Sequence, residues 1–259
     1  YHWNDSFEWA KAAERPIRDG YKILKCYPLA TQQVGRTLVH VQRRMLSPEE
    51  FERALERIRN LKDVVGSQAE IMIDLSGGLN SDQLYRILDL CQEIGVMWVE
   101  EPLDAFNLTG LENLKGRYKF PLAAGERVYT RNGFRNLLDT GAIDVVMPDV
   151  GTCGGVFELV HIAAMAEAYN ARVSPHNCAS TLCTAASLQA WAACANAMPL
   201  EIYPYLPESQ GYVQVLKNAP EDRIRNGRLE ITRDPGLGIA VDSERLAPYC
   251  CFDYLDENK

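Results

Sequence analysis

The chain has 259 residues, of which 47% are apolar and 24% are charged, with a formal net charge of −8 and an isoelectric point near 5.1. This length suits one large domain, since a single α/β barrel takes about 250 residues. An acidic chain without a clustered basic face lacks the surface that nucleic-acid binding needs, and Arg43-Arg44 is interpreted as solvated charge. No apolar run approaches the roughly 18 residues of a membrane span.

The cysteines and the first residues bear on the compartment. Eight cysteines lie mostly within apolar or small-residue runs without Cys-x-x-Cys spacing, and they are interpreted as reduced core residues. Tyr1-His2-Trp3 lacks the basic-then-apolar pattern of a signal peptide. We therefore expect a soluble, cytoplasmic protein with no nucleic-acid or membrane partner.

The beginning of the chain predicts one helix and one strand. Residues 9–19 form a helical run that Gly20 ends. Residues 21–27 follow as a strand, which Pro28 stops because proline cannot donate to a ladder. Residues 31–44 are expected to form a loop.

From Ser47 onward, helical and extended patterns alternate regularly. Ser47 and Pro48 supply an N-cap and a first-turn proline, which predicts a helix over 48–65 that Gly66 ends. Residues 1–3 are interpreted as the tail of a further strand that precedes the others. The remaining predicted elements are strands over 70–74, 96–100, 121–125, 143–147, 171–174 and 200–202, and helices over 80–94, 109–116, 131–139, 154–169 and 179–195.

This alternation, without any antiparallel hairpin signal, predicts a parallel sheet with helices outside, either closed as a barrel or open. After about residue 206 the pattern changes. Residues 228–231 and 234–239 are rich in turn signals and lack helical periodicity. We expect this tail to pack elsewhere than in the barrel wall.

Three carboxylates recur at the ends of predicted strands. Asp74, Glu100 and Glu126 each follow a short apolar run, and the two intervals between them are equal, about the length of one strand-loop-helix-loop unit. Acids at the same end of neighbouring parallel strands converge on one point. They repel each other unless a hard cation lies between them, and Mg²⁺ prefers oxygen ligands and keeps positions open for substrate. The spacing therefore predicts a magnesium site.

The series of strand-end groups continues beyond the acids. Asp149 follows 145–148, and His176 follows the next strand. An acid that bonds one imidazole nitrogen fixes the tautomer and raises the basicity of the other, which makes His176 a candidate general base. Lys25 ends the earlier strand and could hold a carboxylate or stabilise an enolate. Together these groups suit removal of a proton next to a carboxylate.

Each of these residues also has an ordinary structural interpretation. Glu101 and Asp104 are interpreted as acids that face water or cap a helix. His176 alone would be a structural histidine more often than a base, and Asp149 alone could cap a turn. The glycines of 151–155 fit no phosphate-loop pattern. The joint placement of five groups at five successive strand ends favours the site over these alternatives.

Several motifs surround these residues: Ile73-Asp74 before Gly77-Gly78, Val99-Glu100-Glu101-Pro102-Leu103, Ala124-Gly125-Glu126, Pro148-Asp149-Val150-Gly151 with Gly154-Gly155, Ser174-Pro175-His176-Asn177, and Pro235-Gly236-Leu237-Gly238. With them the chain resembles the enolase superfamily over roughly residues 20 to 240. It is similar in particular to the barrel domain of the mandelate racemase and muconate lactonizing enzyme-like members, and to acid-sugar dehydratases. The resemblance implies a modified TIM barrel of the (β/α)7β type.

The resemblance also implies roles for individual residues. Asp74, Glu100 and Glu126 correspond to Mg²⁺ ligands. His176 corresponds to the base or acid with Asp149 as its partner, a use of a base beside Mg²⁺ that is a known pattern of this superfamily. Glu201 corresponds to a position that contacts the substrate or intermediate in relatives.

Two local departures from the family pattern narrow the chemistry. Racemising relatives often carry Lys-x-Lys where this chain has Lys25-Cys26-Tyr27, so a two-base racemase becomes less favoured and Tyr27 is assigned to hydrogen bonding with substrate. Some sugar-acid dehydratases carry a histidine where this chain has Ser76. The resemblance therefore favours elimination by His176 from a sugar acid, with epimerisation or cycloisomerisation on the same metal site as the alternative.

The third departure concerns the domains. Family members have an N-terminal capping domain, which is expected to be missing here together with a complete first strand. Residues 1–206 are expected to form the catalytic barrel, and 207–259 a tail that returns toward the cap. A barrel that retains metal binding without turnover is the alternative of another class. A homo-oligomer that binds a small carboxylate is the expected assembly.

Overall fold

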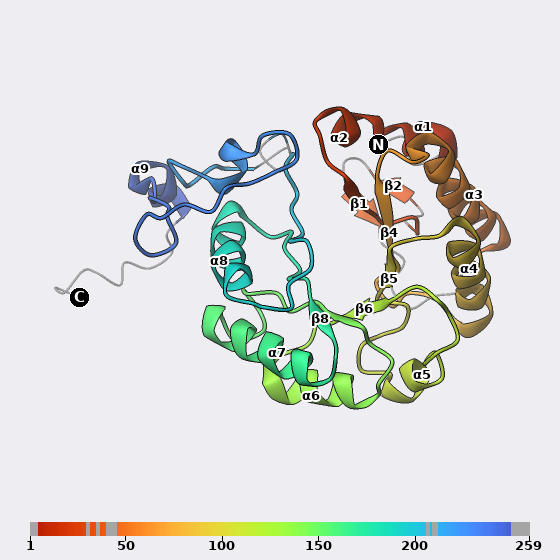
Figure 1. Cartoon of the computed structure of the whole chain (residues 1–259). Helices are drawn as coiled ribbons and strands as arrows, with labels where there is room; N and C mark the ends of the chain where they lie inside the picture. Colours follow the sequence, from red (N-terminus) through yellow and green to blue (C-terminus); the bar gives the residue numbers. More distant parts are fainter. Residues whose placement is uncertain are drawn as a thin grey trace.

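The computed structural model describes residues 5–29, 32–34, 37–39, 46–205, 208 and 212–249. Within these residues one sheet has six parallel strands in the order β1-β4-β5-β6-β7-β8. Figure 1 shows these strands arranged in an arc with helices around its outside. The strands are β1 (Ile23–Cys26), β4 (Glu70–Asp74), β5 (Trp98–Glu100), β6 (Leu122–Ala124), β7 (Val145–Val146) and β8 (Arg172–Val173).

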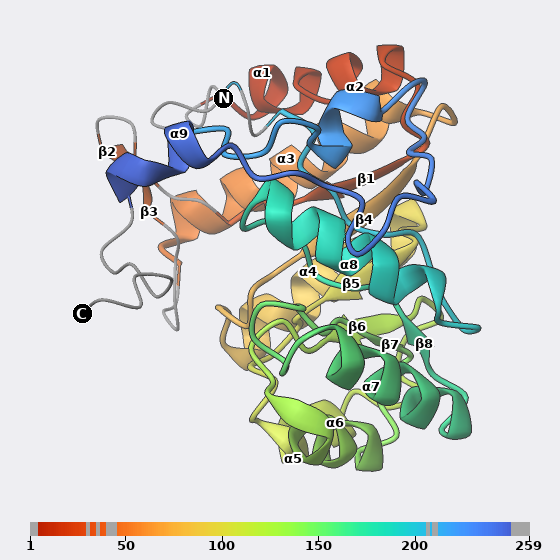
Figure 2. The ribbon, with the colours of Figure 1, turned by 90° about the vertical axis from the view of Figure 1, so that its left-hand side faces the viewer.

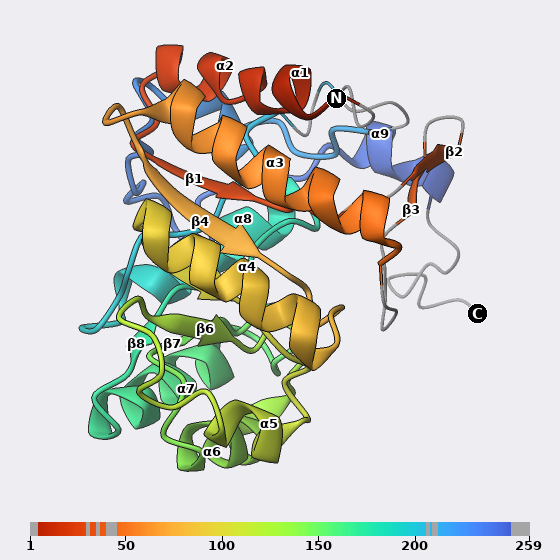
Figure 3. The ribbon, with the colours of Figure 1, turned by 90° about the vertical axis from the view of Figure 1, so that its right-hand side faces the viewer.

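A helix follows each strand from β4 onward, and α3 lies between β1 and β4. Helices α3 and α4 cover the outer face of β1 and β4 (Figure 3). The predicted α/β class with a parallel sheet is confirmed. The helices are α3 (Pro48–Val65), α4 (Ser81–Ile94), α5 (Leu108–Glu112), α6 (Thr130–Asp139), α7 (Val156–Ala168) and α8 (Thr181–Ala192).

Strand alternation separates two apolar clusters. The large cluster fills the space between the sheet and the helices and includes Leu24, Ile73 and Val99. A smaller cluster lies on the other, concave face of the sheet, because successive residues of a strand point to opposite faces. Its buried members are Met72, Trp98, Ala123, Val145 and Met147, with Ile23 packed against them. Two residues further along their strands, on the same face, come Lys25, Asp74 and Glu100.

The longest helix begins where its sequence predicts. The hydroxyl of Ser47 accepts a hydrogen bond from the Glu50 amide at 3.3 Å, and the Glu50 carboxylate accepts one from the Ser47 amide at 3.0 Å. This capping box satisfies two amides that a helix start would otherwise leave unpaired. Phe51, Ile58 and Leu61 face inward at helical spacing and are buried.

The first predicted helix is divided in two. In place of one helix over 9–19, the structure has α1 (Ser6–Lys11) and α2 (Glu14–Arg18). Pro16 explains the division, because a proline inside a helix lacks the amide that would bond four residues back and its ring clashes with that carbonyl.

Residues 31–44, expected as a loop, contain an antiparallel pair, β2 (Gln32–Val34) and β3 (Thr37–Val39). The loop prediction was wrong there, since β-branched residues such as Val34, Thr37 and Val39 favour strands. Residues 1–3, interpreted as part of a further strand, lie outside the described residues.

The predicted strand over 200–202 has no ladder in the structure. Val173 forms an isolated parallel bridge with Ala197, and the Ser174 hydroxyl donates to the Pro199 carbonyl at 2.7 Å. Proline at 199 removes the donor that a ladder needs, so pairing stops before residue 200. Glu201 is therefore held by other means.

The tail follows turns and short helices, η2 (Pro220–Arg223), α9 (Ser243–Leu246) and η3 (Ala247–Tyr249). Figure 2 shows it running past α8 and α2 toward β2 and β3. None of the helices in the described part of the chain is long and apolar enough to cross a membrane. The domain boundary near residue 206 stays a prediction.

Candidate active site

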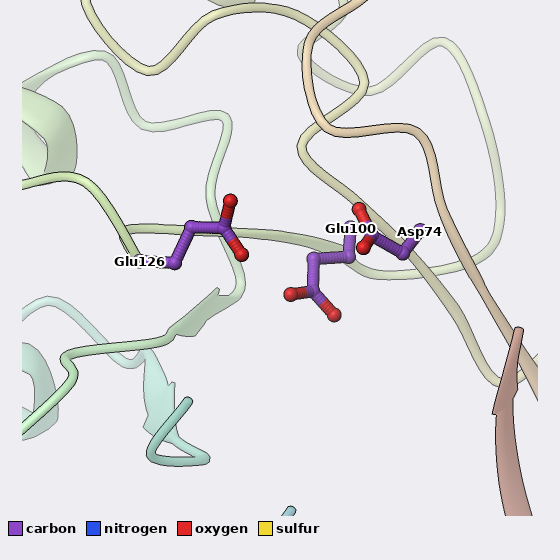
Figure 4. Close-up of side chains that lie close together, drawn as sticks. All are labelled: Asp74, Glu100 and Glu126. Carbon is purple, nitrogen blue, oxygen red and sulfur yellow. The ribbon is translucent and has the colours of Figure 1, made fainter. Parts of the chain in front are cut away.

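Three carboxylates meet at the carboxyl-terminal edge of the sheet. Asp74 ends β4, Glu100 ends β5, and Glu126 lies in the turn after β6. Each offers an oxygen atom, and these atoms all lie within 4.8 Å of one another. Figure 4 shows the three side chains gathered at one point. The convergence predicted from their equal spacing is found.

Two tight turns hold the first and last of these acids. The Ser76 amide donates to Asp74 Oδ1 at 2.8 Å, with Ser76 in the left-handed region at φ 47°. Before Glu126, the glycine at 125 has φ 135°, and a Cβ there would lie 2.6 Å from Phe134 Cε1. Glycine is required at this position because only it combines that backbone conformation with such a close approach.

Glu101 was expected to face water or cap a helix, and the structure corrects this. Its side chain is fully buried, and its oxygens accept from the Gly125 amide at 2.8 Å and from Arg127 Nη2 at 2.7 Å. Buried carboxylates persist where such charged partners compensate desolvation. Glu101 thus fixes the turn that carries Glu126, while Glu100 beside it points into the acid cluster.

The acid cluster is electrostatically unfavourable by itself. Burial raises the pKa of Asp74, Glu100 and Glu126, and for each of them a nearby carboxylate raises the pKa further. Glu100 Oε2 is buried and accepts no hydrogen bond from any described residue. Three convergent oxygen donors, one of them without a partner, fit a hard divalent cation such as Mg²⁺.

Lys25 lies beside this cluster at the end of β1. Its ammonium contacts Glu100 Oε1 at 2.9 Å and Glu201 Oε1 at 2.5 Å. Burial by itself would lower the pKa of Lys25, but the two carboxylates outweigh burial and raise the pKa above its ordinary value. Lys25 is therefore a fixed positive charge at the site rather than a free base.

His176 and Asp149 form the predicted pair. His176 Nδ1 lies 2.7 Å from Asp149 Oδ2, while Asp149 Oδ1 accepts from the Gly151 amide at 2.7 Å. The other ring nitrogen, Nε2, lies 3.4 Å from Glu126 Oε2 and 3.3 Å from the thiol of Cys178. The imidazole is thus anchored on one side and turned toward the acid cluster on the other.

The charges around His176 set its proton affinity. Burial opposes its protonated form, but the bonds to Asp149 and Cys178 outweigh burial and raise the pKa of His176 to about 11. The same pair lowers the pKa of Asp149 against the effect of burial. A divalent cation among the acids would lower the pKa of His176, since like charges disfavour the imidazolium.

The two predicted substrate contacts lie in different surroundings. Glu201 reaches across to Lys25 and also accepts from the Asn177 amide at 3.2 Å. Tyr27, directly after β1, is half-buried and packs against the large apolar cluster. Its contact with substrate stays a prediction.

Sequence reasoning missed four residues that shape the site. Glu101 and Arg127 brace the turn of Glu126, while Asn177 and Cys178 contact Glu201 and His176. The available signal was their position within one or two residues after a predicted site residue. Burial, which decides whether such a neighbour points inward, is not visible in spacing alone.

Comparison with known proteins places this geometry in a family. The sequence model described as enolase C-terminal domain-like matches residues 8–245. The chain belongs to the enolase superfamily. It is 31% identical over 203 residues to D-xylonate dehydratase of Haloferax volcanii, covering 78% of this chain and 48% of that protein.

Two further comparisons agree with this membership. D-galactonate dehydratase of Variovorax paradoxus is 30% identical over 202 residues, which cover 77% of this chain and 53% of the relative. A Mesorhizobium loti protein of solved structure, provisionally described as a dehydratase, has a TM-score of 0.88 and 44% identity, covering 94% of this chain and 63% of that one. This enolase-superfamily chain thus spans about half the length of the curated relatives it matches.

Proposed function

We propose that this chain carries the active site of a Mg²⁺-dependent dehydratase that acts on a sugar acid. The observation that carries the proposal is the position of His176, whose Nε2 lies 3.4 Å from Glu126 of the acid cluster while Asp149 holds its other nitrogen. A base beside a cation site is suited to taking a proton next to a bound carboxylate. The named relatives act on xylonate and galactonate, which are sugar acids of this kind.

The proposed ligands of Mg²⁺ are Asp74, Glu100 and Glu126, because their oxygens converge and Glu100 Oε2 has no other partner among the described residues. When bound, Mg²⁺ supplies positive charge that stabilises the negative charge developing on the substrate carboxylate. Lys25 adds a second fixed positive charge at the same edge of the sheet.

In the proposed reaction His176 Nε2 takes the proton from the carbon next to the carboxylate. The protonated His176 passes this proton to the hydroxyl on the following carbon, which leaves as water, and the resulting enol tautomerises to a ketone. Asp149 holds the imidazole orientation throughout. No second lysine lies two residues after Lys25, since Tyr27 stands there directly after β1, and this favours elimination over two-base racemisation.

Replacing His176 tests the proposal. The full-length protein with Mg²⁺ is screened against aldonic and aldaric acids, and water loss is followed through the keto-acid product. His176→Asn is expected to lower kcat by about 100-fold or more, because general acid–base groups contribute that much. The matched control is His161→Asn on the outer helix α7, because the His161 ring meets the Phe157 ring edge to face, away from the site. Undiminished turnover by His176→Asn would exclude this base.

Solvent deuterium distinguishes the chemistry of the rival reactions. Incorporation of deuterium next to the carboxylate without loss of water would favour epimerisation, and ring closure or opening would favour cycloisomerisation. Binding of Mg²⁺ without turnover of any acid would favour a metal-binding barrel that is not an enzyme.

A further inference from the structure

Asn177 is the buried residue directly after His176, and it contacts none of the three acids of the metal cluster in the described structure. We propose that Asn177 is a positioning residue that holds Glu201 and, through Glu201, the ammonium of Lys25. This inference rests on the proposed function, because it assigns Lys25 and Glu201 to that reaction.

Asn177 contacts both the main chain and the side chain of Glu201. The Asn177 amide nitrogen donates to Glu201 Oε2 at 3.2 Å, and its side-chain Nδ2 donates to the Glu201 carbonyl at 3.0 Å. The side chain of Asn177 therefore fixes where the backbone of Glu201 runs, and its backbone N–H fixes where the Glu201 carboxylate points.

Glu201 needs such support because no strand carries it. The segment after α8 pairs with β8 through the isolated bridge of Val173 and Ala197, and Pro199 then interrupts pairing. Other acids at the site, such as Asp74 and Glu100, end strands that ladders hold on both sides. For Glu201 the hydrogen bonds of Asn177 replace that ladder.

The carboxylate held in this way reaches across the open side of the sheet. Glu201 Oε1 contacts Lys25 Nζ at 2.5 Å, although β1 and β8 are the two ends of the strand order. Lys25 also contacts Glu100, which lies in the acid cluster. Displacement of Glu201 would therefore move the ammonium relative to the substrate carboxylate.

The side-chain amide of Asn177 is itself anchored by helix α8. Asn177 Nδ2 donates to the Thr184 hydroxyl at 3.0 Å, and that hydroxyl can donate to Asn177 Oδ1 at 3.4 Å or to the Ser180 carbonyl at 3.3 Å. Asn177 and Thr184 are both buried, at 1% and 3% exposure. A buried amide with these partners has one orientation, which is what positioning requires.

The chain offers a matched control in Asn196. Its Nδ2 donates to the carbonyls of Ala163 and Ala171, both at 3.0 Å, so it ties the same segment to the fold without touching the site. Asn177→Ala and Asn196→Ala each remove one side-chain amide that bonds a backbone carbonyl, so both are expected to lower thermal stability. Asn177→Ala keeps the backbone N–H that donates to Glu201 Oε2, so it acts by releasing the backbone of Glu201, which carries the carboxylate with it. Only Asn177→Ala should alter the site.

The test compares these variants in the full-length protein. Asn177→Ala is expected to lower kcat by about 10- to 100-fold, the cost of misplacing a catalytic group by about 1 Å, with Mg²⁺ affinity by calorimetry changed less than about twofold. Asn196→Ala should keep kcat within about twofold of the parent. If Asn177→Ala does not fold, Thr184→Val, which keeps the shape and removes only the anchoring hydroxyl, should shift kcat in the same direction.

Crystal structures of the variants separate this inference from the proposed function. The Lys25–Glu201 contact is expected to open beyond 4 Å, the limit of an ion pair, in Asn177→Ala and to persist in Asn196→Ala. An intact contact in Asn177→Ala, or an open contact with unchanged kcat, overturns the inference. If the parent protein turns over no sugar acid, the proposed function fails, and the crystallographic comparison still decides whether Asn177 positions Lys25.

Discussion

The imidazole of His176 is anchored through one ring nitrogen and faces the acid cluster with the other. Asp149 occupies Nδ1, and Nε2 faces Glu126 and the thiol of Cys178. This orientation of the imidazole ring depends on a contact between neighbouring strand ends, since Asp149 follows β7 and His176 follows β8. The imidazole therefore connects Asp149 on one side with the acid cluster on the other.

Glu126 is the acid whose replacement is cleanest to interpret. Glu126→Gln keeps its size but removes a ligand charge, so Mg²⁺ affinity should fall by at least about 10- to 100-fold, the loss measured for weaker, indirect changes at metal sites. Without metal, the variant should unfold at a temperature no lower than the parent, because a buried acid beside Asp74 is lost. Calorimetry and melting curves with and without Mg²⁺ measure both effects. Glu70→Gln, at the exposed start of β4, is the control and should leave both unchanged.

Cys178 is predicted to be the most readily alkylated thiol of the described residues. It is exposed, whereas the other cysteines in the described part of the chain are buried or half-buried, and exposure decides whether the reagent can reach the sulfur. Burial raises the pKa of Cys91 to about 12, so that thiol should stay unmodified in the folded protein. N-ethylmaleimide followed by peptide mass mapping checks the order of modification. Alkylation should abolish turnover in the parent and not in Cys178→Ser, and early labelling of Cys91 would contradict the prediction.

The turn between β6 and α6 depends on Gly125, which precedes Glu126 of the acid cluster. Gly125→Ala is expected to destabilise the fold by more than about 2 kcal/mol, since a strained left-handed residue costs about 1 to 2 kcal/mol and the new methyl would also overlap Phe134. Gly95→Ala, which ends α4 at φ 71° with open space around it, should cost only the conformational part. Urea unfolding measures both variants. Equal losses of stability in the two variants would show that Phe134 moves away from the new methyl group without a cost in free energy.

The docking of the tail on the barrel should respond to pH. Burial raises the pKa of Glu221 in η2, and the Thr184 hydroxyl opposes this only in part. The folded chain therefore binds this proton more tightly than the unfolded chain, so this group lowers stability as pH rises from its ordinary value of 4.5 through its raised value. Glu221→Gln should be more stable than the parent at pH 7, with the difference shrinking toward pH 4. Urea unfolding across this range measures the difference, with Glu244→Gln at an exposed position as the matched control.

Much of this architecture could be predicted because local signals and tertiary packing agree. Apolar runs that end in Asp74 and Glu100 specify both a strand and an inward-facing acid, so spacing was enough to place them. The prediction was wrong where one residue decides the outcome, as Pro16 does for the first helix and Pro199 for the last strand. It also missed Glu101, because adjacent glutamates look alike in sequence, whereas in the structure Glu101 turns away from the acid cluster toward the Gly125 amide and Arg127.

The contact between Lys25 and Glu201 has a consequence for the order in which the site assembles during folding. Every strand of the main sheet pairs with the strand that precedes it in that sheet, so the three acids can come together through short-range connections. Lys25 meets Glu201 only when the two ends of the barrel segment approach each other, and loop-closure entropy delays such distant contacts. The half of the site built from the three acids should therefore form on the folding pathway before the half built from Lys25 and Glu201.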